Sequence, residues 1–176
     1  RFLLAAAERF AHLRFIDVGG GLGIPEKPGQ SPLDLSAVDG HLSTVHAVRP
    51  DLEIWMEPGR FLVAESGVLL CRVTQVKAKG DVHYVGVDVG MNSLIRPALY
   101  GAHHDIVNLS KLGQPRTEVV HVVGPICETG DTLGHARRLP LTEEGDVLMI
   151  ADAGAYGRVM ASHYNRRLPA AETVLT

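Results

Sequence analysis

The segment that most restricts how this 176-residue chain can fold is residues 15–24, which read FIDVGGGLGI. Its apolar start predicts a short buried strand, and three consecutive glycines, Gly19, Gly20 and Gly21, follow directly. Glycine has no Cβ, so several backbone N–H groups can converge on an anion. The segment is therefore a candidate phosphate-binding loop, and a purely structural glycine turn is the alternative.

The dinucleotide-binding pattern G-x-G-x-x-G does not account for this loop. Counted from Gly19, the last required glycine is replaced by Ile24, and Pro25 stands where a helix would begin. Enzymes with (β/α)8 barrels commonly bind phosphate in the loops after their last strands. We therefore interpret the segment as the end of a barrel strand.

The residues around this loop predict a βαβ unit. Residues 1–13 have the spacing of an amphipathic helix. Ser31 and Pro32 suggest a helix start, and apolar residues then recur every three or four positions until Pro50. Residues 52–56 predict a second strand, which would lie parallel to the first.

Beyond residue 60 the pattern is mainly β. Runs at 68–76, 82–89, 106–109, 118–123 and 147–151 are separated by glycine and proline turns, as in an antiparallel barrel or sandwich. Only residues 92–100 and 156–163 look helical. We therefore predict α/β plus β: the last βα units of a (β/α)8 barrel in residues 1–59 and a β-domain in residues 60–176.

The predicted strand at residue 15 would have a bare edge, and two βα units cannot close a barrel. We therefore expect the chain to be a C-terminal fragment of a longer protein, with the end of its β-domain also incomplete.

Composition limits the partners. The chain is 45% hydrophobic and 21% charged with a net charge of −3, which favours neither a nucleic-acid partner nor a membrane span. Its two cysteines, Cys71 and Cys127, form no C-x-x-C motif and favour a reducing, cytoplasmic setting.

The sequence EPGR follows the second predicted strand, where barrel enzymes place their sites. The forked guanidinium of Arg60 suits phosphate oxygens, and the carboxylate of Glu57 suits a cationic ring nitrogen. A plain surface ion pair is the alternative.

Three later segments carry further candidate groups. In GPICETGD, Cys127 is a candidate proton donor or nucleophile, or alternatively a small buried apolar residue. In DAGAYG, Tyr156 either projects into a cleft or packs in a turn. In LIRPALY, Arg96 and Tyr100 would share a helix face and hold a carboxylate, or form a surface pair.

Two other groups are assigned to packing or structure. Cys71 lies inside an alternating strand pattern, so we expect it to be buried. His103, His104 and Asp105 are adjacent, but chain neighbours do not face one point, and we predict no metal site.

Five motifs in this order, GGGLGI, EPGR, MNSLIRPALY, GPICETGD and DAGAYG, resemble the pyridoxal-phosphate decarboxylases of the alanine-racemase-like fold. The resemblance covers about residues 15–175 and is strongest to members that convert meso-2,6-diaminopimelate to L-lysine and CO2. It implies a cofactor-carrying barrel, a C-terminal β-domain and a homodimer with shared active sites. The cofactor it implies is pyridoxal 5'-phosphate.

The resemblance also implies roles at the cofactor. The backbone of Gly19, Gly20 and Gly21 would hold the phosphate, with Gly59, Arg60 and Tyr156 contributing. Glu57 would face the pyridine nitrogen and keep it protonated, so that the ring can accept electrons.

At the substrate, the resemblance implies that Cys127 reaches in from the partner subunit and protonates the α-carbon. Glu128 would bind the ammonium at the distal stereocentre. The implied substrate-binding residues are Arg60, Arg96, Tyr100, Glu128 and Tyr156, of which Arg60, Arg96 and Tyr100 would hold the distal carboxylate.

The chain departs from the family in lacking the lysine that bonds to the cofactor. None of its four lysines, Lys27, Lys77, Lys79 and Lys111, matches that motif, so we expect these residues alone to be inactive. The segments SHYN and GMNSLIRPALYG also resemble decarboxylases fused to an aspartate kinase. Alternatives are an ornithine- or arginine-type decarboxylase, a non-catalytic binding or regulatory homologue, and a half-barrel that binds sugar or nucleotide phosphates.

Overall fold

The computed structural model describes residues 2–175 and divides the chain into two compact units, Arg1–Leu62 and Val63–Thr176. The first unit is α/β and the second mainly β, which confirms the predicted fold class. The division follows Leu62; the predicted domain ranges 1–59 and 60–176 stay a prediction.

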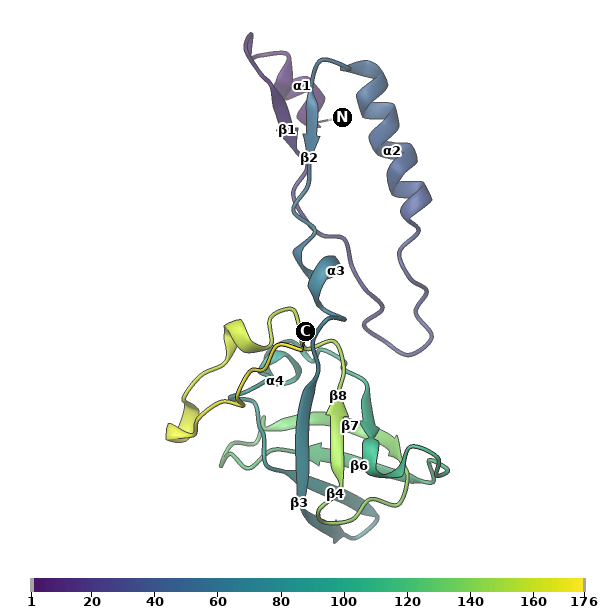
Figure 1. The fold of residues 1–176 in the computed structure, drawn as a ribbon, viewed down its shortest axis with the longest axis vertical. Coiled ribbons are helices and arrows are strands. Elements are labelled where there is room, and N and C mark those ends of the chain that lie inside the picture. Colours follow the sequence, from purple (N-terminus) through teal and green to yellow (C-terminus); the bar gives the residue numbers. More distant parts are fainter. Residues whose placement is uncertain (1, 176) are drawn as a thin grey trace. The chain divides into compact units, whose positions relative to one another are not determined.

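The first unit is built around two short parallel strands (Figure 1). They are β1 (Phe15–Asp17) and β2 (Glu53–Trp55), with Ile16 opposite Ile54. Helix α1 (Phe2–Ala7) precedes β1 and helix α2 (Leu35–Val48) joins the strands, so the predicted βαβ unit is confirmed. The predicted helix over residues 1–13 is too long, because the chain turns after Ala7 and leaves Phe10 exposed.

The start of α2 differs from the prediction. Ser31 and Pro32 lie outside the helix, and Asp34 is the N-cap. Its carboxylate accepts the N–H groups of Ser36 at 2.9 Å and Ala37 at 3.1 Å. A carboxylate that pairs two orphan donors is a stronger start signal than the Ser-Pro pair, so the helix begins at the aspartate.

The first unit buries little apolar surface. Ala7, Ile16 and Leu52 form its buried apolar cluster, Ile24 is buried in the loop after the glycines, and the rings of Phe15 and Trp55 stack with centroids 4.0 Å apart. Helix α2 has no buried residue along its apolar stripe. Among residues 2–175, no helix is both long and apolar enough to cross a lipid bilayer.

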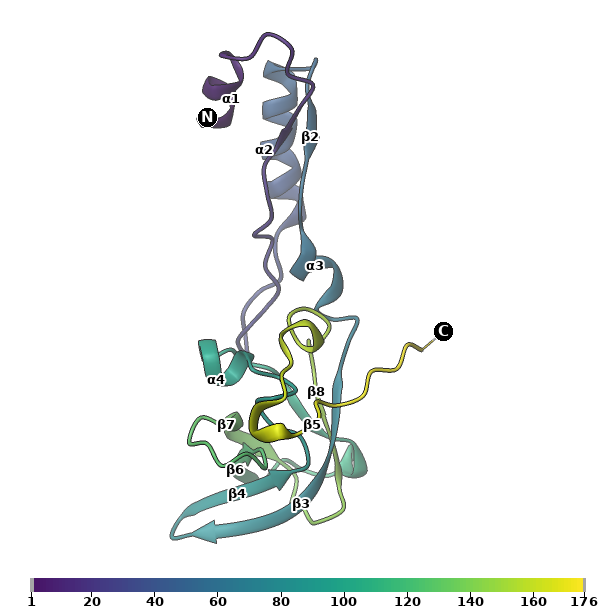
Figure 2. The same cartoon turned by 90° about the vertical axis from the view of Figure 1, so that its left-hand side faces the viewer.

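The second unit is a single six-stranded sheet in the order β5-β8-β3-β4-β6-β7. Only the β4–β6 pair is parallel. The two edge strands, β5 and β7, contact each other: the Ile106 side chain occupies the space that a Cβ on Gly134 would need. The sheet therefore curls into a nearly closed barrel (Figure 2). The strands are β3 (Leu69–Lys79), β4 (Val82–Val87), β5 (Ile106–Asn108), β6 (Glu118–Val123), β7 (Thr132–Leu139) and β8 (Val147–Ile150).

Strand β7, which reads TLGHARRL, is the strand that the sequence pattern did not predict. Its pairing with β6 is irregular, and Ala136 adopts a left-handed φ of 48° at the irregularity. Such a bulge breaks the two-residue alternation on which strand prediction depends.

A single apolar core fills the curled sheet. Cys71 belongs to it, as predicted, and burial raises the pKa of its thiol to about 12. The fully buried members of the core include Val73, Val85, Val87, Leu94, Val122, Leu133, Leu139, Leu148 and Ile150.

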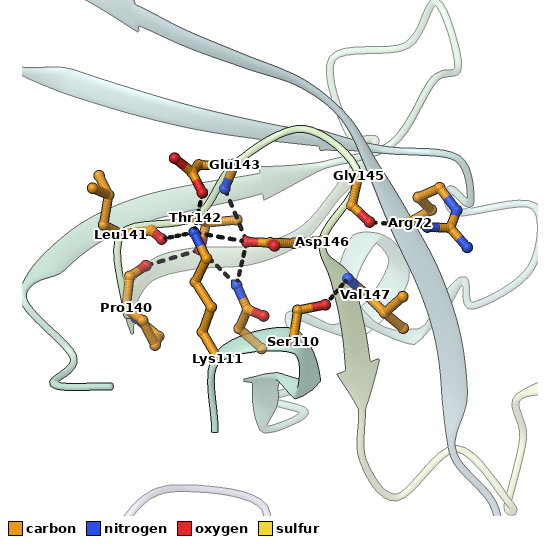
Figure 3. Close-up of polar contacts among 11 residues, drawn as sticks. Arg72, Ser110, Lys111, Pro140, Leu141, Thr142, Glu143, Gly145, Asp146 and Val147 are labelled. Atoms are coloured by element: carbon orange, nitrogen blue, oxygen red, sulfur yellow. Dashed lines mark hydrogen bonds and ion pairs between the residues drawn. The ribbon is translucent and has the colours of Figure 1, made fainter. Parts of the chain in front are cut away.

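One corner of the barrel is held by a polar cluster around Asp146 (Figure 3). Its Oδ2 accepts hydrogen bonds from the Glu143 N–H and the Asn108 side-chain amide, both at 2.9 Å. Lys111 Nζ lies 3.4 Å from the same oxygen and donates to Glu143 Oε2 at 2.6 Å. Burial alone would raise the pKa of Asp146, but these donors outweigh it and the pKa is lowered.

We expect Asp146→Ala to lower the free energy of unfolding at pH 7 by about 1–3 kcal/mol, since the buried Asn108 amide loses the nearer of its two acceptors and the Glu143 N–H loses its acceptor. Because the folded pKa of Asp146 is lowered, its stabilisation is complete above the unfolded pKa of about 3.9. This stabilisation is lost as the pH falls through the folded pKa of Asp146. Below that pH, the unfolding free energies of wild type and Asp146→Ala should therefore become equal.

Urea denaturation between pH 3 and pH 7 measures this effect. The matched control is Glu143→Gln, because that side chain is exposed and its pair with Lys111 is worth less than about 1 kcal/mol. Equal losses in both variants would contradict a specific role for Asp146.

Candidate functional site

The two loops that follow β1 and β2 lie together, as expected for the carboxyl ends of adjacent parallel strands. The Val18 N–H donates to Trp55 O at 2.9 Å, and the Glu57 N–H donates to Gly19 O at 2.9 Å. The glycine loop and the EPGR segment are thus hydrogen-bonded to each other. Helix α3 (Gly59–Val63) begins directly after them.

Each of the three glycines has a steric reason to be glycine. Gly19 and Gly21 have φ values of 75° and 91°, which side chains rarely tolerate. A Cβ on Gly20 would lie 2.5 Å from Glu57 O. The loop therefore presents bare backbone at the strand end, as a phosphate cradle requires.

Arg60 lies in α3 and pairs with a residue that we had not predicted. Its Nη1 donates to Glu26 Oε1 at 2.6 Å, and both side chains are partly exposed. Glu26 belongs to the loop after the glycines, where a single charged residue gives no pattern to detect. The ion pair closes that loop against α3 and fixes the direction of the guanidinium.

In the second unit, the GPICETGD segment is a tight loop organised by Asp131. This residue is 4% exposed, and its carboxylate accepts the N–H groups of Met91 at 2.6 Å and Ile126 at 2.7 Å. Burial raises the pKa of Asp131, while these two bonds oppose the rise. A Cβ on Gly90 or Gly124 would collide with the carboxylate, which explains glycine at both positions.

The loop places Cys127 and Glu128 at the surface of the second unit. Cys127 is an exposed free thiol, so it is not the small buried residue considered as an alternative. Glu128 Oε2 accepts a hydrogen bond from the Tyr164 hydroxyl at 2.8 Å, and this contact raises the pKa of Tyr164. Tyr164 lies 36 residues further along the chain, so no local pattern could have indicated it.

Arg96 begins the predicted helix, α4 (Arg96–Tyr100), four residues before Tyr100. Arg96 is 5% exposed and Tyr100 is 64% exposed, so they do not form a simple surface pair. Arg96 Nη1 lies 3.3 Å from His104 Nε2, and His104 Nδ1 lies 2.8 Å from Ala151 O. His104 thereby connects α4 to the end of β8, just before the DAGAYG turn.

Tyr156 projects from a strained turn. It is partly exposed and has a φ of 58°, in the left-handed region that a bulky residue seldom occupies. Gly154 packs against Val63 O and Gly157 against Ala153 O so closely that neither has room for a Cβ. These close contacts explain glycine at both positions, and the exposure of Tyr156 favours a projecting ring over an aromatic packed in the turn.

His103 belongs to a different contact group from His104. It hydrogen-bonds with Asp105 and with the half-buried Arg137. Within residues 2–175, no three histidine, cysteine, aspartate or glutamate side chains come together as a metal site requires.

The chain belongs to the pyridoxal-dependent decarboxylases: residues 17–154 match the family described as "Pyridoxal-dependent decarboxylase, C-terminal sheet domain". It is similar to the diaminopimelate decarboxylase of Archaeoglobus fulgidus, with 44% identity over 168 residues, covering 93% of this chain and 40% of that protein.

Two solved structures extend the comparison. A crystal structure of diaminopimelate decarboxylase superposes with a TM-score of 0.87 and 37% identity, over 94% of this chain and 43% of that one. The lysine decarboxylase of Selenomonas ruminantium has a TM-score of 0.81 and 25% identity, over 97% and 44%. The chain thus spans about 40% of the length of the curated relatives it matches.

The residues of the first unit fit the phosphate of the family's cofactor. Residues 19–21 have no side chains that could block an anion, and a side chain at Gly20 would collide with the Glu57 backbone. Arg60 supplies a planar cation on the neighbouring element, and Glu57 supplies a carboxylate in the hydrogen-bonded EPGR segment.

We expect Gly20→Ala to reduce stability by about 1–3 kcal/mol, because the new Cβ must push the Glu57 backbone away. The same shift should weaken pyridoxal-phosphate binding by the complete protein at least tenfold. Urea denaturation and cofactor titration by absorbance measure the two effects.

Gly23→Ala is the matched control, since nothing lies within 4 Å of its added Cβ. If both variants bind the cofactor like wild type, the loop is a structural turn and not a cradle.

Proposed function

We propose that this chain supplies the last barrel strands and the β-domain of a decarboxylase that uses pyridoxal 5'-phosphate to convert meso-2,6-diaminopimelate to L-lysine and CO2. The family match supports the cofactor, and the relative from Archaeoglobus fulgidus supports the substrate.

The observation that carries the substrate assignment is the nearly buried Arg96. A permanently charged guanidinium in a site of low exposure favours a substrate whose distal end is a carboxylate. Diaminopimelate has such an end, whereas lysine and ornithine end in an ammonium that Arg96 would repel. The buried cation therefore disfavours the ornithine- and arginine-type alternatives.

At the cofactor, the glycine backbone at residues 19–21 would bind the phosphate, with Gly59, Arg60 and Tyr156 contributing. The Glu57 carboxylate would hold a proton on the pyridine nitrogen. Bound pyridoxal phosphate supplies an electron sink for the bond that breaks to CO2. The role of these residues is to keep the ring oriented and its nitrogen charged.

At the substrate, Arg96 with Arg60 and Tyr100 would bind the distal carboxylate. Glu128, oriented by the Tyr164 hydroxyl, would bind the distal ammonium. Cys127 would donate its Sγ proton to the α-carbon after CO2 leaves. Opposite charges at the two groups of the distal centre would select one stereochemical arrangement of the substrate.

We further propose a cytoplasmic homodimer in which Cys127 and Glu128 serve the partner's cofactor. Their position in one exposed loop of the second unit suits a contribution across a subunit interface. The two free thiols suit a reducing compartment.

The direct test is release of L-lysine and CO2 from meso-diaminopimelate by the complete protein with pyridoxal phosphate. L-lysine and L-ornithine, offered as substrates, should give no cadaverine or putrescine. A protein that decarboxylates these two and not diaminopimelate would overturn the substrate assignment, and one with no turnover would support a non-catalytic homologue.

In the same assay, Cys127→Ala should lower kcat by about 10²–10⁴ with the cofactor still bound, because the α-carbon loses its proton donor. Thr129→Ala, an exposed change in the same loop, should leave kcat unchanged. Equal kcat values for the Cys127→Ala variant and wild type would remove the thiol from the reaction.

Arg96→Ala should raise KM for diaminopimelate about 10- to 100-fold, the equivalent of a charge-assisted hydrogen bond, with the cofactor absorbance intact. The matched control is Arg116→Ala, an exposed arginine outside the site. An unchanged KM in the Arg96 variant would exclude it from the substrate site.

A further inference from the structure

His104 is a fully buried titratable group to which the proposed mechanism gives no role. It is 0% exposed and lies in the short connection between α4 and β5. A buried polar side chain is retained only with its hydrogen bonds made, so its two contacts reveal what it does.

Those contacts determine which ring nitrogen carries the proton. Ala151 O can only accept, so His104 Nδ1, at 2.8 Å, must donate to it. Arg96 can only donate, so His104 Nε2, at 3.3 Å from Nη1, must be the acceptor. The ring is therefore neutral, with the proton on Nδ1.

The surroundings agree with a neutral ring. Burial lowers the pKa of His104, and the Arg96 and His103 side chains lower it further. The Ala151 carbonyl and the Asp152 carboxylate act in the opposite direction. A protonated ring would direct an N–H at the Arg96 cation and break the contact.

We propose that His104 is a positioning residue for substrate recognition: its bare Nε2 fixes the guanidinium plane of Arg96, and its Nδ1–H anchors that contact to the end of β8. The bond takes one of the five guanidinium donors and sets the direction of the others. This inference rests on the proposed function, in which Arg96 holds the distal carboxylate.

The same anchor couples two parts of the proposed site. Ala151 directly precedes the DAGAYG turn that carries Tyr156, so His104 joins the helix of the substrate arginine to the strand end of the cofactor tyrosine. A displacement of the His104 ring would therefore shift both the Arg96 side chain and the turn that carries Tyr156. The effect should appear mainly in substrate binding, because Arg96 is the side chain in direct contact.

Two variants distinguish the hydrogen bond of Nε2 from that of Nδ1. In His104→Gln, the side-chain oxygen can replace Nε2 as the acceptor for Arg96. In His104→Asn, the shorter amide can replace only the Nδ1–H donor to Ala151. A purely structural histidine would be replaced equally well, or equally badly, by both.

With the complete protein and diaminopimelate, we expect KM within about threefold of wild type for His104→Gln and raised at least tenfold for His104→Asn. We expect kcat at saturating substrate and the cofactor absorbance to stay near wild type in both. His103→Gln is the matched control and should leave KM unchanged. One common KM in the two His104 variants, or a loss in kcat alone, would overturn the positioning role.

A measurement on the wild-type protein covers the case in which the variants do not fold. The 15N shifts of His104 should show a protonated Nδ1 and a bare Nε2; a protonated Nε2 would overturn the inference. This result needs no substrate. If wild type releases no lysine from diaminopimelate, the proposed function fails; if it does and the His104 predictions fail, only the inference does.

Discussion

The second unit depends on a buried carboxylate that binds two stretches of backbone at once. Asp131 accepts hydrogen bonds from the N–H groups of Met91, in the turn before α4, and Ile126, in the loop that carries Cys127. Placing a carboxylate where it is 4% exposed is costly, as the raised pKa shows, and only short, well-directed N–H bonds offset that cost. Glycine at positions 90 and 124 then follows, since any side chain there would displace the carboxylate.

The candidate groups of each unit share one design. Arg60 is held by Glu26, Arg96 by His104, and Glu128 by Tyr164. In each case a charged side chain proposed to contact a ligand has a protein partner that restricts its direction. Charged groups that are already oriented lose less conformational entropy when a ligand binds. Both units thus supply oriented charged groups, the first at Arg60 and the second at Arg96 and Glu128.

Local sequence patterns predicted much of the fold, and they selected the candidate site residues whose roles stay predictions. Runs of β-forming residues predicted β4 and β6. The glycine run predicted a bare-backbone loop, and the structure adds that this loop is hydrogen-bonded to the EPGR segment. The pattern failed at β7, where the bulge at Ala136 disrupts alternation, and at the start of α2, where Asp34 caps the helix in place of Ser31 and Pro32. Glu26, Asp131 and Tyr164 were not predictable as partners, because contacts between residues 34–40 positions apart leave no periodic signal.

The contrast between the two cysteines gives the chain a chemical asymmetry. Cys71, with a pKa near 12, stays protonated inside the barrel, whereas Cys127 is open to solvent. A maleimide or an acrylamide should therefore modify one position on this chain, beside the groups proposed to hold substrate. That selectivity would allow a spectroscopic label, or a covalent inhibitor, to be installed there without mutating the second thiol.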